Sequence, residues 1–327
     1  YAVEEENQNE RDDKDDNEDE NKYQPGSGNE EGPGNDESRN KMEVEDGIAE
    51  YTVQQLVPDF KEMKVIDHKP YVAIGKMKNV IVCLKIAYGY KWYGEIMRRL
   101  ENINSVHISR IISCQELKDV RLVSYSRKDS LNVMTKLWKT VTERLYELEE
   151  LFLNITLKPL MWKLETLRLV MKELLIGLKH IHEQNILHMD ISRWNIMLRK
   201  VDDSFTPVYI DFGCSKLYSS KRRVKRSIFD WNTYPYHPDT FGTEILSPKI
   251  DVFSLGVVFA EMYKMLLTGS FEYKEDNQPS CNPWNLMRSF AEQHHSNVPP
   301  AYCDKIKTLI HGMIADEAEA RFTVTQC

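Results

Sequence analysis

The sequence predicts an α+β fold in which a small β-rich lobe precedes a larger helical lobe. Short apolar runs rich in β-branched residues, such as YVAIG at 71–75 and VIVCLKIA at 80–87, dominate the chain up to about residue 125. From about residue 130 onward, apolar residues recur at helical spacing instead. We therefore expect lobes over 51–127 and 128–327, with a ligand-binding cleft between them.

The β-rich part contains further strand patterns and one short helix. VHISRIISC and VRLVSYS have the apolar, β-branched composition of strands. Residues 93–103 place Ile96, Leu100 and Ile103 on one helical face. We therefore expect a short amphipathic helix that leads back into strand structure.

The part after residue 130 contains several helical patterns. Residues 131–153 form a long amphipathic segment, and 131–158 is longer than a connection between two lobes needs. We expect an extended helix or an insertion there, with its leucine and tryptophan stripe packed in the core. The other expected elements are helices over 164–184, 251–267 and 302–316 and a short strand over 207–213.

The first 50 residues differ in composition from the rest. They hold 19 acidic and 5 basic residues, a net charge of −14, whereas the remainder holds 51 − 19 = 32 acidic and 43 − 5 = 38 basic residues, a net charge of +6. Such a stretch, with few large apolar side chains, cannot bury enough surface to offset its ordering entropy. We expect 1–50 to be a disordered acidic tail, either simply solvated or bound to basic partners.

The cysteines and the apolar runs indicate an intracellular protein. The six cysteines are scattered without a CxxC pair, which favours buried thiols in a reducing compartment and argues against a zinc site. No apolar run approaches the roughly 20 residues of a membrane span, and the acidic N-terminus does not match a secretory signal. Because the chain starts at Tyr1 and ends at Cys327, we expect it to be a fragment.

Two short motifs carry the chemistry. His188-Met189-Asp190 is followed by Asn195, and Asp211 begins an Asp-Phe-Gly sequence 21 positions after Asp190. Together they resemble the protein kinase superfamily, whose signature also includes a lysine on an earlier strand. Further matches appear in the family's order: VCLK, which ends at Lys85, HPD at 237–239, DVFSLG at 251–256 and DEAEAR at 316–321.

The resemblance implies a two-lobed kinase fold over roughly residues 60–327 and a role for each motif residue. Asp190 would accept the proton of the acceptor hydroxyl, and Lys85 would neutralise the α- and β-phosphates of ATP. Asp211 and Asn195 would hold Mg²⁺. Lys85 would in turn need an acidic partner on the adjacent helix, for which Glu95 is our choice and Glu101 the alternative.

The resemblance also implies supporting roles. Asp251 would contact the backbone of the catalytic loop, although the residue could simply cap its helix. Arg321 would pair with Asp239, and His188 would be a packed residue rather than a proton carrier. Thr233 is a candidate for the threonine next to the substrate.

The adenine site is expected at the connection between the lobes. Tyr125, Ser126 and Arg127 resemble the hinge whose backbone binds adenine in kinases. Ser124 or Val123 would then be the gatekeeper that precedes the hinge. Ser124, Tyr125, Ser126 and Arg127, together with Lys85, Glu95 and Asp211, form the predicted nucleotide-binding set.

The chain departs from the kinase pattern in three places. EMKVIDHK at 62–69, where a glycine-rich lid belongs, has no glycine, so we expect weaker or unusual nucleotide binding. Met189 replaces the loop arginine that pairs with an activation-loop phosphate, so activity would not depend on that switch. Ser192 replaces a lysine, and Arg193 would supply the missing charge near the γ-phosphate. The loop is similar to that of fungal-specific protein kinases.

The resemblance implies an ATP- and Mg²⁺-dependent protein serine/threonine kinase. Its partners would be ATP and a protein substrate, without nucleic acid or membrane. The alternative is a pseudokinase that acts as a binding or scaffold module, which the missing glycine lid favours. A small-molecule kinase of the same fold is a third reading, disfavoured by the protein-kinase character of HPD, DVFSLG and Arg321.

Overall fold

The computed structural model describes residues 58–68, 71–89, 92–117, 136–202, 204–219, 236, 245–270 and 297–327. The expected acidic tail over 1–50 lies outside these residues. Among the helices that the structure describes, none is long and apolar enough to cross a membrane.

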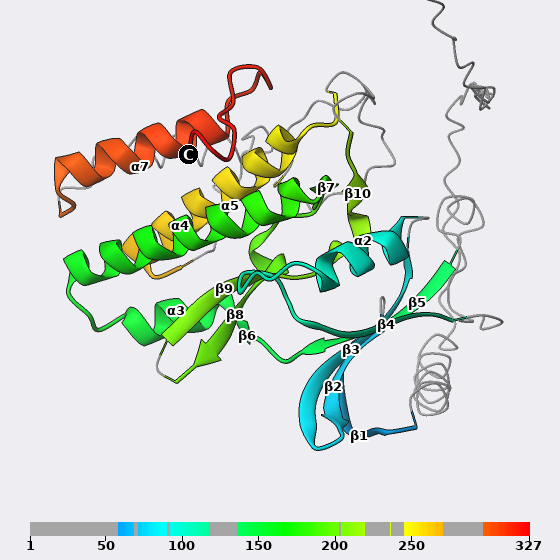
Figure 1. Cartoon of the computed structure of the whole chain (residues 1–327). Helices are drawn as coiled ribbons and strands as arrows, with labels where there is room; N and C mark the ends of the chain where they lie inside the picture. Colours follow the sequence, from blue (N-terminus) through cyan, green and yellow to red (C-terminus); the bar gives the residue numbers. More distant parts are fainter. Residues whose placement is uncertain are drawn as a thin grey trace, which may run out of the picture. The chain divides into compact units, whose positions relative to one another are not determined.

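The first lobe is built on a five-stranded antiparallel sheet with the strand order β1-β2-β3-β5-β4 (Figure 1). Val82, Leu84 and Ile86 alternate along β3 and are fully buried, so the intervening Cys83 and Lys85 project from the other face. The strands are β1 (Phe60–His68), β2 (Tyr71–Met77), β3 (Val80–Gly89), β4 (Ile111–Leu117) and β5 (Lys136–Glu143).

Helix α2 (Tyr93–Glu101) follows β3, as the sequence predicts. Its buried side is formed by Tyr93, Ile96, Met97 and Leu100. This i, i+3, i+4, i+7 spacing places all four side chains on one helical face. The helix packs against the first lobe with this face, close to β4.

The described residues 136–158 do not form the extended helix expected over 131–158, because only Leu148–Ile155 among them is helical. Lys136–Glu143 is strand β5, paired with β3 on one side and β4 on the other. The β-branched Thr140, Val141 and Thr142 suit a central strand, and the two ladders override the helical periodicity. The chain therefore leaves the sheet after Glu143, so the first lobe extends beyond the boundary predicted at residue 127. The strand predicted in VRLVSYS lies outside the described residues.

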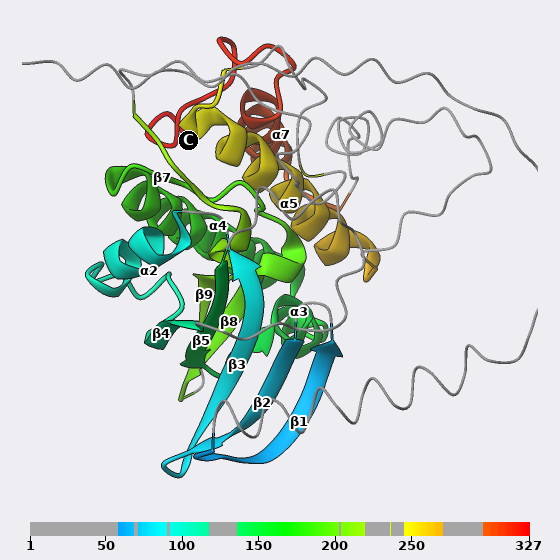
Figure 2. The ribbon, with the colours of Figure 1, turned by 90° about the vertical axis from the view of Figure 1, so that its right-hand side faces the viewer.

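The second lobe is mainly helical, and its long helices α4 and α5 lie side by side (Figures 1 and 2). Helix α5 begins at Pro248 and is buried from Ile250 to Lys264, which confirms the predicted core helix. The lobe thereby confirms the predicted α+β, two-lobed fold. Its helices are α3 (Leu148–Ile155), α4 (Leu160–Glu183), α5 (Pro248–Thr268) and α7 (Pro300–Met313).

Short strands in the second lobe position its loops. Strand β8 pairs with both β6 and β9, and β7 pairs with β10. The loop between β7 and β8 and the turn that follows β9 carry the two motifs found in the sequence. These strands are β6 (Tyr146–Glu147), β7 (Ile186–Leu187), β8 (Ile196–Val201), β9 (Ser204–Tyr209) and β10 (Lys216–Leu217).

Candidate active site

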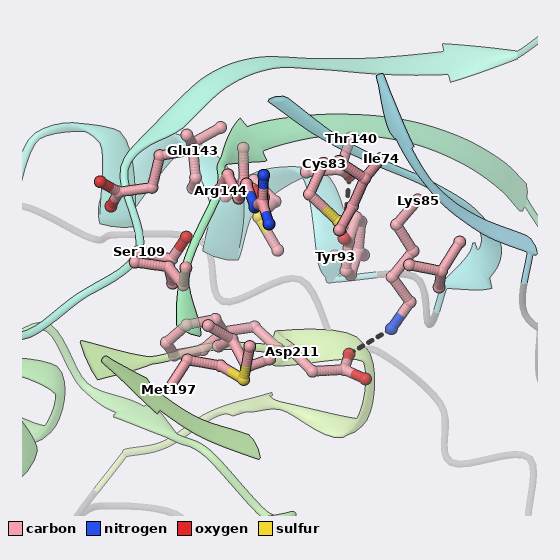
Figure 3. Close-up of a pocket in the computed structure, with 17 residues that line it drawn as sticks. Ile74, Cys83, Lys85, Tyr93, Ser109, Thr140, Glu143, Arg144, Met197 and Asp211 are labelled. Carbon is pink, nitrogen blue, oxygen red and sulfur yellow. Dashed lines mark hydrogen bonds and ion pairs between the residues drawn. The ribbon is translucent and has the colours of Figure 1, made fainter. Parts of the chain in front are cut away.

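A cavity of about 280 Å³ lies between the sheet and the second lobe (Figure 3). Its sheet side is mainly apolar, with Val72, Ile74 and Cys83, and Met197 and Ile210 line it from the second lobe. Lys85 and Asp211 also line it and place opposite charges at its edge. The cavity therefore suits a flat apolar ring that carries charged groups at one end.

Lys85 and Asp211 form an ion pair across the cavity (Figure 3). Asp211 Oδ1 also accepts a hydrogen bond from the Gly213 amide at 3.1 Å. Burial by itself would raise the pKa of Asp211, but the charge of Lys85 and these two hydrogen bonds outweigh it and lower the pKa. Asp211 is therefore an ionised carboxylate at neutral pH, held in a left-handed conformation with φ 58° that Asp tolerates.

Asp190 and Asn195 meet in the loop between β7 and β8. Asn195 Nδ2 donates to the Asp190 carbonyl and to Asp190 Oδ2, both at 2.8 Å. These two bonds fix the orientation of the amide and leave its oxygen, Oδ1, directed away from Asp190. The five-residue spacing in the sequence thus brings together a carboxylate and an amide that holds it in place.

Asp251 supports this loop from helix α5. It is fully buried, and it accepts hydrogen bonds from the backbone amides of His188 at 2.8 Å and Met189 at 2.9 Å. His182 Nε2 donates to the same carboxylate at 2.9 Å. The predicted contact between Asp251 and the loop backbone is confirmed, and it explains how Met189 is held at φ 68°.

His188 is a packed residue, as predicted. It is fully buried, and its Nε2 donates to the Ile210 carbonyl at 2.9 Å. Its ring lies 4.7 Å from that of Phe212, centroid to centroid. His188 therefore joins the loop that carries Asp190 to the turn that carries Asp211.

Comparison with known proteins agrees with this geometry. The protein kinase domain family matches residues 75–327, most of the chain. The chain belongs to the protein kinase family. As a family, protein kinases use ATP and a divalent metal ion and act on proteins.

Curated kinases are similar over shorter stretches. Death-associated protein kinase dapk-1 of Caenorhabditis elegans is 26% identical over 219 residues, 64% of this chain and 14% of that protein. Serine/threonine-protein kinase dkf-1 of the same species is 25% identical over 161 residues, 49% and 21% of the two chains. Serine/threonine-protein kinase D2 of Homo sapiens is 24% identical over 143 residues, 44% and 16%. The matched region thus spans less than a quarter of each of these relatives.

The structure does not bring Glu95 to the kinase lysine. Glu95 forms ion pairs of 2.7 Å with Arg98 and Arg99, and these hydrogen bonds lower its pKa. Glu101, the alternative, is exposed at the end of α2. The α2 residues that line the cavity are Tyr93 and Met97. Because Glu95 lies two positions after Tyr93, about 200° around the helix, it faces away from the cavity.

The connection between the kinase lobes lies later in the chain than predicted. Ser124, Tyr125, Ser126 and Arg127, like Val123, lie outside the described residues. Instead, residues 142–145, at the end of β5 and just after it, line the cavity. The signal that could have found them is the β-branched run before residue 143, which the helical spacing around it concealed.

Glu143, at the end of β5, binds residues on either side of the connection between the lobes. It forms an ion pair with Arg199 of β8, whose Nε donates to Glu143 Oε2 at 2.9 Å. Glu143 Oε1 also accepts a hydrogen bond from the Arg110 backbone amide at 2.7 Å. The side chain thus links the end of the sheet to the second lobe.

Arg193 has a partner on helix α3. Its Nη1 donates to Glu149 Oε1 at 2.5 Å, and its guanidinium lies 4.5 Å from the centre of the Trp194 ring. Ser192, at the lysine position, is buried, and its hydroxyl has no hydrogen-bond partner among the described residues. Arg193 is therefore paired with Glu149. That Arg193 supplies a positive charge near the γ-phosphate stays a prediction.

Met189 occupies the arginine position with an apolar contact. It is buried in a cluster with Leu187, Leu246 and Ile250, against which Tyr218 packs. That Met189 serves no phosphate switch stays a prediction, because residues 220–235 lie outside the described residues.

The remaining motif residues are only partly described. Arg321 is buried, donates to the carbonyls of Ala315 at 2.6 Å and Asp316 at 2.7 Å, and lies over the Phe253 ring. Its predicted partner Asp239 lies outside the described residues, as does Thr233.

Proposed function

We propose that this chain transfers the γ-phosphoryl group of ATP to a serine or threonine hydroxyl of a protein. The observation that carries the proposal is the arrangement of Asp190, Asn195, Lys85 and Asp211. The first two are joined by two hydrogen bonds, the last two by an ion pair, and His188 and Phe212 connect the pairs. Phosphoryl transfer depends on positioning and charge neutralisation, which this arrangement supplies.

The oxygen donors fit a hard divalent cation. Lys85 Nζ and the Gly213 amide both donate hydrogen bonds to Asp211 Oδ1, so neither of them occupies Asp211 Oδ2. Asn195 Oδ1 is oriented away from Asp190 because the amide nitrogen binds that residue. Carboxylate and amide oxygens are ligands that Mg²⁺ accepts. When bound by Asp211 and Asn195, Mg²⁺ would neutralise charge on the phosphates of ATP.

The protein's own groups would act as follows. Asp190 accepts a hydrogen bond from the serine or threonine hydroxyl and aims its oxygen at the γ-phosphorus. A bond forms between that oxygen and the phosphorus while the bond from phosphorus to the bridging oxygen of ADP breaks. The hydroxyl proton passes to Asp190 and then to solvent. Lys85 leaves Asp211 to bind the phosphates, and Asn195 keeps Asp190 in place.

A second candidate function is a pseudokinase, which binds partners without transferring phosphate. The glycine-free segment 62–69 favours it. This segment contributes most of β1 in place of a glycine-rich lid that would let backbone amides approach phosphates. The complete set of acidic and amide groups in the second lobe favours the enzyme.

Transfer of labelled phosphate from ATP distinguishes the two functions. Purified chain 1–327 is mixed with γ-labelled ATP, Mg²⁺ and unstructured proteins rich in serine and threonine. Asp190→Ala and Asp211→Ala variants serve as controls. We expect Asp190→Ala to lower kcat at least about 100-fold. Transfer by the wild type that does not exceed these controls would exclude the enzyme.

We further infer an intracellular location and a role for the acidic tail. Cys83, Cys114, Cys214, Cys303 and Cys327 are all free thiols, which supports a reducing compartment. The net charge of −14 over residues 1–50 supports binding of that tail to basic partners.

A further inference from the structure

Tyr93 lies where helix α2 faces the cavity, next to the strand that carries Lys85. It is the first residue of α2, is 7% exposed and lines the cavity. Its hydroxyl is hydrogen-bonded to Thr140 Oγ1 at 3.0 Å (Figure 3). The bond is buried and joins α2 to strand β5.

The register of the sheet places this bond beside Lys85. Thr140 is the residue of β5 directly opposite Lys85 of β3. Residues opposite each other in an antiparallel pair project from the same face, with Cβ atoms about 5 Å apart. The Tyr93 hydroxyl therefore meets the sheet at the position next to the stem of Lys85. Burial raises the pKa of Tyr93, so this group stays a neutral phenol.

Helix α2 offers no carboxylate to Lys85 in this structure. Glu95 is bound by Arg98 and Arg99, and Glu101 is exposed at the helix end. Lys85 is paired with Asp211 instead. A neutral phenol cannot pair with an ammonium group as a carboxylate does. To bind phosphates in the proposed function, Lys85 would leave Asp211, and no carboxylate on α2 would hold it in position.

We infer that Tyr93 is the positioning residue for Lys85. Its hydrogen bond to Thr140 holds α2 against the sheet beside the lysine, in place of an acidic partner on α2. The bond joins α2 to β5 at the residue opposite Lys85, on the face of the sheet from which the lysine projects. The inference rests on the proposed function, because the position of Lys85 affects ATP binding only if Lys85 binds the phosphates of ATP.

The inference predicts a specific kinetic pattern. Tyr93→Phe keeps the ring but removes the hydroxyl, and Thr140→Val removes its partner with little change in shape. Each change should raise KM for ATP roughly 3- to 10-fold, the worth of one hydrogen bond, and leave kcat within about twofold. Thr140→Val also removes a contact of 3.7 Å between Thr140 Oγ1 and Cys114 Sγ, so the double variant should be no worse than Thr140→Val alone. Tyr302→Phe, on the distant helix α7, is the matched control.

Amide hydrogen exchange tests the same link without any activity. In the nucleotide-free chain, Tyr93→Phe and Thr140→Val should each speed exchange of the α2 amides about as much as KM rises, whereas Tyr302→Phe should not. The inference is overturned if both variants keep KM for ATP within twofold of wild type, or if their α2 amides exchange as slowly as those of wild type. If the wild type transfers no phosphate, the proposed function is lost, and the exchange rates alone then decide whether Tyr93 anchors α2.

Discussion

The two lobes of this kinase meet at one cavity but hold their functional groups in different ways. In the second lobe, Asp190 and Asn195 bind each other, and the loop that carries them is tied to the fully buried Asp251. In the first lobe, Lys85 has no acid from α2, and the segment 62–69 has no glycine. The second lobe thus keeps the acidic and amide residues of the kinase motifs, while the first lobe departs from the kinase pattern.

This difference suggests a contrast between two proposed tasks, proton acceptance in the second lobe and nucleotide binding in the first: we expect the first lobe to tolerate more changes of residue. In the proposed function, Asp190 accepts a proton, which needs one carboxylate in one place, so we expect its loop to tolerate little change. Nucleotide binding would be the sum of several weaker contacts, so we expect the first lobe to tolerate more change. We therefore expect changes in the second lobe to have the larger effects.

The largest expected loss of stability comes from Asp251→Ala. The change removes three hydrogen bonds to a buried carboxylate, from His182 and from the backbone amides of His188 and Met189. We expect the free energy of unfolding to fall by about 3–5 kcal/mol. Urea unfolding of the variant, beside Asp304→Ala at an exposed position of α7, measures it. A midpoint equal to that of the control would break the contrast between the lobes.

The next effect is a pH dependence that arises from Glu261 of α5. Burial raises its pKa to about 7, although Tyr236, which donates to it at 2.6 Å, acts against the rise. The folded chain therefore binds more protons at this group than the unfolded chain, whose pKa is near 4.5. This stabilising contribution is complete below pH 4.5 and is lost as the pH rises through about 7, by up to roughly 1.4 kcal/mol per pH unit.

Replacement of Glu261 by Gln isolates this contribution. Unfolding of wild type and Glu261→Gln is compared between pH 4.5 and 7.5, and the difference between their free energies of unfolding should vary with that slope. Asp211, whose pKa is lowered, has the opposite sign and cancels in the comparison because both chains contain it. A difference that is flat over this range would show that Glu261 is ionised throughout.

The smallest expected effect concerns the connection between the lobes. Glu143→Ala removes the ion pair with Arg199 and the bond from the Arg110 amide, and both side chains of the ion pair are about one-fifth exposed. We expect a loss of about 1–2 kcal/mol in the free energy of unfolding. Thermal unfolding beside Glu147→Ala, an exposed neighbour, measures it. A loss larger than that of Asp251→Ala would reverse the order of the lobes.

The same contrast decides what the sequence alone can predict. Asp190 and Asn195 are five residues apart, so the motif alone identifies both residues, although their hydrogen bonds to each other appear only in the structure. The buried helix that carries Asp251 is equally clear, because its apolar run is long. The two-lobed fold follows from the change of periodicity near residue 130.

The first lobe resists prediction because its contacts depend on tertiary structure. Strand β5 has a helical pattern of apolar residues but lies between two partner strands, and the ladders decide its conformation. Glu95 is the nearest acid on α2, yet the buried face that Tyr93, Ile96, Met97 and Leu100 define directs it away from Lys85. The i, i+3, i+4, i+7 spacing of this apolar face is the feature of the sequence that indicates which way Glu95 points.

The dependence of phosphate transfer on ATP concentration tests the contrast most directly. It is measured for wild type and Asp190→Ala with Mg²⁺ and a protein acceptor, over micromolar to millimolar ATP. We predict that wild-type transfer saturates only toward millimolar ATP, at the upper end of common KM values, and that Asp190→Ala lowers the plateau at least about 100-fold. The contrast between the lobes is contradicted if wild-type transfer never exceeds that of Asp190→Ala, because the second lobe would then not catalyse transfer. It is also contradicted if transfer saturates at a few micromolar ATP, because the affinity for ATP would then not be weakened.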